Sequence, residues 1–288
     1  MNVVAPRRTV MQSLTGIWRY RELLLNLVRK ELKVRYKNSS LGFIWSMLNP
    51  AMYLVVFYVV FQLVLKAGIP YFAVFLLSGL LAWNLFSASL GGATGSITGN
   101  APLVNKVWFP REILPLASVG ANCVHFVLQG IVLVIALIGF RFNVDWGYVW
   151  LILPAVVALV LLTSACAVFL AAANVYARDT QHFLELALLA WFWMTPIVYQ
   201  WDLQARQLSS GGRSPMLTLL NPVTPIVLAL QRALYGITTM SGGQRLLPLE
   251  SSLWYARNLV VVILVAAVLF VLALRMFTRV EGDFAEEL

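Results

Sequence analysis

The chain has 288 residues, of which 60% are hydrophobic and 11% are charged, and its formal net charge is +9. Soluble domains carry about 25% charged residues, so a water-soluble fold could not hide this much apolar surface. The apolar stretches are continuous and lack the alternation of barrel strands, so the sequence predicts an all-α membrane protein.

Positive charge gathers at the N-terminus, where nine of the 21 Lys and Arg residues precede residue 38. Apolar residues recur there at helical spacing, which predicts an amphipathic helix over residues 17–37, lying in the membrane interface. An ordinary helix packed on another subunit is the alternative. The basic residues that would face the headgroups are Arg29, Lys30, Lys33, Arg35 and Lys37.

Long apolar segments predict six transmembrane helices, at about 43–65, 71–97, 114–140, 148–174, 180–201 and 258–275. The fifth has its uncharged part between Glu185 and Asp202, which covers only about 24 Å of helix. Residues 202–256 are apolar in part but are broken by prolines and glycines. This region therefore predicts short re-entrant helices on the outer side, buried against protein.

An even number of crossings places both termini on one side of the membrane. The basic N-terminus favours the cytoplasm, because positively charged segments near the first helix usually stay inside. We therefore predict a multi-pass protein of the inner membrane with a cytoplasmic segment 1–42, a transmembrane domain 43–276 and a cytoplasmic tail 277–288. The polar loop at 98–113 would also be cytoplasmic, as would the loop that contains Arg178 and Asp179.

The sequence shows no chemistry of its own for catalysis or energy supply. The glycine-rich run at 91–96 lacks the lysine of a phosphate-binding loop and lies inside a predicted span. There is no HExxH motif or Cys–His cluster, so we expect no metal site. Ion-coupled carriers usually show more ionisable groups in their spans. We expect a transport subunit, not an enzyme, with no cofactor in this chain.

Aromatic residues are abundant, with ten Trp, ten Tyr and 16 Phe. They are explained either as interfacial belts and ordinary packing or as the lining of a path for sugars, whose apolar faces stack on aromatic rings. The candidates for such a path are Tyr53, Tyr58, Trp83, Phe86, Trp191, Trp193 and Tyr199.

Three stretches carry a family resemblance: residues 32–42 followed by Trp45 and Asn49-Pro50, residues 105–115, and residues 174–179. In them the chain resembles the transmembrane subunit of ABC-2 type polysaccharide exporters, the O-antigen and teichoic-acid permease group. The resemblance implies a homodimer of permeases bound to two copies of a separate ATP-binding subunit, which would hold ATP and Mg. It also implies a channel at the dimer interface for a lipid-linked cell-envelope polysaccharide.

The same resemblance makes residues 98–113 the coupling segment that docks on the ATP-binding subunit. Its contact candidates are Asn105, Lys106, Trp108, Phe109, Pro110, Arg111 and Glu112. Arg111 and Glu112 are expected to offer charged contacts to that soluble partner. The loop at 202–215 looks longer than usual for the family.

Only the amino-acid composition of the chain favours one polysaccharide substrate over another. Arg far outnumbers Lys and Ala is abundant, which indicates a GC-rich genome and favours a galactan precursor over O-antigen and teichoic acid. One competing hypothesis is an ABC-2 permease for a small drug or lipid, which would have a closed hydrophobic cavity. Another is a membrane-embedded enzyme, which would need an acidic cluster in a loop.

Overall fold

The structure is a computed structural model that describes residues 10–36, 44–139, 141–240, 243, 245–282 and 284–287. Helices are the regular structure throughout these ranges, which contain no strand and a single isolated bridge between Thr239 and Arg245. The all-α prediction is confirmed.

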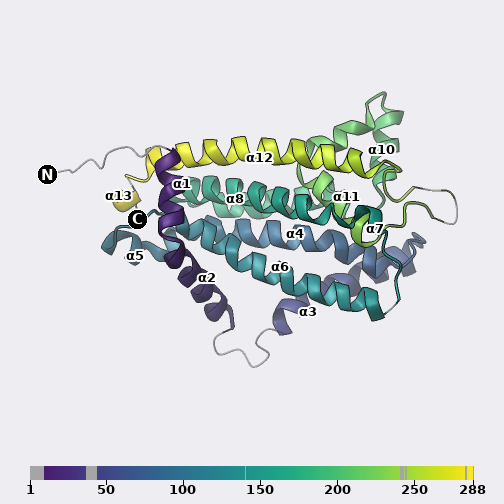
Figure 1. Cartoon of the computed structure of the whole chain (residues 1–288), viewed down its shortest axis with the longest axis horizontal. Coiled ribbons are helices and arrows are strands. Elements are labelled where there is room, and N and C mark those ends of the chain that lie inside the picture. The colour runs from purple at the N-terminus through teal and green to yellow at the C-terminus, as the bar shows by residue number, and fades with distance from the viewer. Residues whose placement is uncertain are drawn as a thin grey trace.

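Long helices lying side by side form the body of the molecule (Figure 1). Within the described ranges four are long and apolar enough to cross a membrane: α4 (Phe72–Thr94), α6 (Ile113–Gly139), the run Trp146–Tyr176 and α12 (Ser252–Val280). The third of these consists of the short α7 (Trp146–Val149) and α8 (Ile152–Tyr176). These four helices match the second, third, fourth and sixth predicted spans, although α12 is longer than the predicted 258–275.

The first and fifth predicted spans are shorter or less regular helices. The first is α3 (Ile44–Phe57), which continues directly into the π-helix η1 (Tyr58–Val64). The fifth is α9 (Thr180–Met194), whose 15 residues cover about 22 Å. It ends just before Pro196, a residue that has no amide hydrogen to continue a helix.

The N-terminal segment is two helices, where the sequence predicted one over 17–37. They are α1 (Val10–Arg19) and α2 (Arg21–Tyr36), with a turn at Tyr20. The reason is tertiary, because α1 crosses the end of α12 while α2 turns onto α6 (Figure 1). Arg35 lies in the last turn of α2, whereas Lys37 lies outside the described residues.

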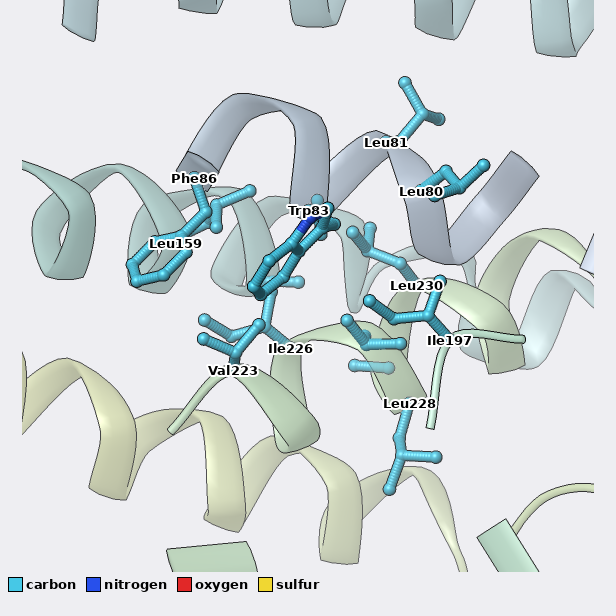
Figure 2. Close-up of a cluster of buried hydrophobic side chains, with 14 of the residues drawn as sticks. Leu80, Leu81, Trp83, Phe86, Leu159, Ile197, Val223, Ile226, Leu228 and Leu230 are labelled. Atoms are coloured by element: carbon cyan, nitrogen blue, oxygen red, sulfur yellow. The ribbon is translucent and has the colours of Figure 1, made fainter. Parts of the chain in front are cut away.

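The region predicted as re-entrant contains α10 (Trp201–Ser210), the 3-10 helix η3 (Pro215–Leu220) and α11 (Val223–Leu234). Nearly every residue of α11 is buried. Figure 2 shows Val223 and Ile226 of α11 gathered with Trp83 of α4 and Leu159 of α8. This helix therefore belongs to the core at the end of the bundle opposite α5 (Figure 1).

The chain builds two hydrophobic cores. The larger one lies between α4, α8, α11 and α12. The smaller one lies at the other end and joins α2, the loop before α6 and the last turns of α8 and α12. It includes Phe284 of α13 (Phe284–Glu287), which is fully buried. Part of the predicted cytoplasmic tail is therefore packed against the bundle.

Candidate coupling face and aromatic surface

Residues 98–113, the coupling segment, form two short helices and a loop between α4 and α6. The helices are η2 (Thr98–Asn100) and α5 (Ala101–Lys106). Pro102 stands in the first turn of α5, where its missing amide hydrogen costs nothing. The Asn100 side chain donates a 2.8 Å hydrogen bond to the Ser96 carbonyl oxygen, which closes the turn after α4.

Within this segment an exposed tip sits on a buried base. Asn105 and Lys106 are exposed, and Trp108 keeps 66% of its surface open. Phe109 and Pro110 are buried, and Phe109 belongs to the smaller core. The segment can therefore offer an aromatic and a cationic side chain to a partner without losing its anchor.

Arg111 and Glu112 differ from the expectation that both offer charge to a soluble partner. Glu112 is 0% exposed, and neither carboxylate oxygen has a hydrogen-bond partner among the described residues. Arg111 is half-buried, donates to the Glu281 carbonyl oxygen and lies over the Phe284 ring at 5.9 Å. Glu112 therefore points into the fold, and Arg111 is held by the C-terminal residues.

The N-terminal helices α1 and α2 contact the coupling segment. The Trp108 ring meets the Tyr20 ring edge-on, with centroids 6.4 Å apart. Lys30 Nζ donates a 2.8 Å hydrogen bond to Asn100 Oδ1. A predicted headgroup-facing lysine thus contacts the segment itself, and Lys30, Arg29 and Lys33 are all exposed.

The contact between α2 and α6 depends on a glycine. A methyl group added at Gly120 of α6 would lie 2.8 Å from Val28 Cγ2. Only glycine lets the two helices approach this closely. The position of α2, and with it Lys30, is therefore set by α6.

The C-terminal residues close the same end, a feature that the sequence analysis missed. Tyr176 at the end of α8 donates a 3.0 Å hydrogen bond to the Val280 carbonyl oxygen. The Phe284 ring meets Tyr176 and Phe277 edge-on, at 6.1 and 5.3 Å. Phe284, an apolar residue among the acidic residues of the predicted tail, was the available signal. Arg178, which the sequence placed at this end, is exposed beside Asp179.

An aromatic surface is shared by α3, η1 and α9. Tyr53, Tyr58 and Trp193 are exposed, and we call these three the aromatic surface. Phe57 lies beneath it, stacked on Tyr53 at 5.9 Å and on Phe192 at 5.9 Å. Residues from the first and fifth predicted spans are thus brought into one layer.

The other predicted path aromatics lie deeper. Trp83 is buried and Phe86 is 0% exposed, and both point into the cluster of Figure 2. Trp191 is half-buried and donates a 2.7 Å hydrogen bond to Asn221 Oδ1. Tyr199 donates to the Trp193 carbonyl oxygen at 2.7 Å. These four side chains support the surface or the core in this conformation.

Comparison with known proteins identifies this arrangement. Residues 22–209 match the family described as ABC-2 type transporter, a range that covers α2 to α10. The chain belongs to the ABC-2 type transporter family. The match includes the coupling segment and the three helices of the aromatic surface, α3, η1 and α9. In the ranges that the structure describes, no three His, Cys, Asp or Glu side chains lie close enough to hold a metal ion.

Curated relatives of this ABC-2 chain have names that concern polysaccharides. The chain is 38% identical over 221 residues to an O-antigen export system permease protein RfbA of Myxococcus xanthus, covering 76% of this chain and 82% of the relative. It is 31% identical over 208 residues to an RfbA protein of Klebsiella pneumoniae, covering 72% and 78%. A shorter match, 29% over 98 residues, is to the polysialic acid transport protein KpsM of Escherichia coli, covering 33% and 36%.

Proposed function

We propose that this chain is the membrane subunit of an ABC exporter that moves a lipid-linked cell-envelope polysaccharide from the cytoplasmic to the outer face of the inner membrane. The similarity to O-antigen export permeases over about four fifths of a relative's length is the observation that carries the proposal. The coupling segment and the aromatic surface give it a physical basis.

The four long helices account for four membrane crossings. The continuous run of α3 and η1 would make a fifth, and the short α9 a sixth. Six crossings require both termini on one side, and α1 and α13 do lie at the same end of the bundle (Figure 1). We assign this end to the cytoplasm from the basic N-terminal segment. The helices α10, η3 and α11 then lie at the outer face, with α11 re-entering the bundle.

Energy would come from two copies of a separate ATP-binding subunit, which would also bind Mg. The exposed tip of the coupling segment, with Lys106 and Trp108, is the surface that fits a soluble partner. Buried Phe109 and the Arg111 contact with Glu281 connect the tip to α6 and α12. A push on the tip would therefore move whole helices, because packed side chains transmit displacement as a body.

A dimer of this chain would place two copies of the aromatic surface opposite each other. Tyr53, Tyr58 and Trp193 combine flat apolar rings with polar edges, which suits the alternating C–H faces and hydroxyls of a sugar chain. An extended polymer could slide over such rings while each sugar is held weakly. A small drug or lipid, the competing substrate class, would have no need of such a layer.

The test is export by purified complexes of this chain and its ATP-binding partner in proteoliposomes. Lipid-linked O-antigen, teichoic acid and galactan are supplied separately, with galactan favoured by the arginine-rich composition. We expect one of the three to be exported and to stimulate ATP turnover. If none of the three polymers is exported and a small hydrophobic drug is, the result would instead support the competing hypothesis of a drug or lipid permease.

A control variant separates the path from the fold. Tyr53→Ala with Trp193→Ala should lower polymer export while leaving basal ATP turnover intact, since both side chains are exposed. The same substitution at exposed Leu153 of α8 should leave both unchanged. Equal effects from the two would argue against an aromatic path.

A further inference from the structure

An apolar groove of about 660 Å³ lies between α9 and α12, with α4 and α8 as its floor. Its walls include Phe183 and Ala187 of α9 and Leu272 of α12, and Thr180 supplies the one hydroxyl among its lining side chains. Lining residues of α9 recur at helical spacing on one side, whereas Trp193 of the aromatic surface projects from the other. A dimer formed through the aromatic surface would leave this groove open to the membrane.

The groove has the length of one membrane leaflet. Along α9 it extends from Thr180 to Trp191, which is about 16 Å of helix. This is about half of a hydrocarbon core roughly 30 Å thick. Its α12 wall is the stretch 269–276, close to the end where α1 and α13 lie (Figure 1). The groove therefore belongs to the half of the bundle nearer the coupling segment.

Three exposed arginines are close in sequence to lining residues at the end of the groove nearer α1 and α13. Arg178 is two residues before Thr180, Arg275 is next to the lining residue Met276, and Arg279 follows within one turn. All three are exposed, and the described acidic residues nearest to them in the sequence are Asp179 and Glu281. A positive rim over an apolar slot complements an amphiphile with a negative head and an apolar chain.

We propose that this groove binds one acyl chain of an anionic membrane phospholipid, with the lipid phosphate held by Arg178, Arg275 and Arg279. A helix from a second copy is the competing occupant, but a helix would span both leaflets and would gain nothing from three arginines at one end. The bound lipid would fill the gap between α9 and α12. This inference does not depend on which polymer is exported.

Native mass spectrometry of the purified full-length chain tests the proposal. The protein is titrated with phosphatidylglycerol or phosphatidylcholine, and lipid retained per chain is counted. Two exposed arginines near a charged lipid head give about 30-fold in affinity, so Arg275→Gln with Arg279→Gln should lose that much phosphatidylglycerol binding and little phosphatidylcholine binding. Arg257→Gln, at the far end of α12, is the matched control.

A second pair of variants tests the groove itself. Ala187→Trp would fill it and should abolish phosphatidylglycerol retention, whereas Ala190→Trp, an exposed alanine on α9 outside the lining, should not. Equal retention of the two lipids by the wild-type chain would overturn the proposal. So would an Ala187→Trp chain that keeps its lipid but changes from dimer to monomer, because the occupant would then be a second copy. Neither result would bear on polymer export.

Discussion

Replacing Gly120 by alanine probes the link between the N-terminal helices and the bundle. The new methyl would lie 2.8 Å from Val28 Cγ2, roughly 1 Å short of a normal carbon–carbon contact of about 3.5–4.0 Å. Valine is stiff at its first side-chain torsion, so α2 must move as a body. Overpacking of this kind costs about 1–3 kcal/mol. Alanine regains about 0.5–1 kcal/mol because it is a better helix former than glycine.

The matched control is Gly130→Ala on the same helix, where a methyl meets nothing within 4 Å. It should be neutral or slightly stabilising. The two variants should therefore differ in stability by about 1–3 kcal/mol, measured as denaturation midpoints of the purified chain in detergent. Because α2 holds Asn100 through Lys30, Gly120→Ala should also weaken export driven by the ATP-binding partner.

Adding Val28→Ala removes the clashing methyl and should restore both stability and export to the Gly120→Ala chain. Identical midpoints for the Gly120 and Gly130 variants, or no rescue by Val28→Ala, would refute the reasoning. Either result would mean that α2 does not rest on α6 as described.

Other contacts lead to three shorter predictions. Trp108→Ala should change the free energy of unfolding by less than about 1 kcal/mol but should uncouple ATP turnover from export. Phe109→Ala should lower the free energy of unfolding by about 3–5 kcal/mol. Comparable denaturation midpoints for the two variants would contradict the exposed tip and the buried base. Asp145→Ala should lower the free energy of unfolding by about 1–3 kcal/mol, measured by thermal denaturation, because it removes a 2.9 Å ion pair from the Arg232 side chain, which is 11% exposed. Asp145 itself is partly exposed, which limits the loss. Phe284→Ala should release the C-terminal residues from the bundle, which would be seen as faster trypsin cleavage near the C-terminus with an unchanged denaturation midpoint of the whole chain. An unchanged cleavage rate would count against the packed tail.

Composition and hydropathy are enough to predict the class of this protein and the presence of its long helices. Uncharged apolar runs have few alternatives to a membrane helix, so α4, α6, α8 and α12 lie where hydropathy predicts them. The same local signals located the coupling segment, since Pro102 and Pro110 interrupt the apolar pattern and expose a short polar stretch. The family motifs lie in these connecting segments.

Which side chains of those segments face outward depends on how the helices pack against one another. Periodicity cannot show that Glu112 is buried, that Arg111 is taken up by the C-terminal residues, or that Phe86 lies in the core while Tyr53 is exposed. Each of these depends on contacts between residues far apart in the chain, and charge or aromaticity alone gives no direction. The bend at Tyr20 has the same origin, because no local helix breaker stands there and the turn follows from the separate docking of α1 on α12 and of α2 on α6.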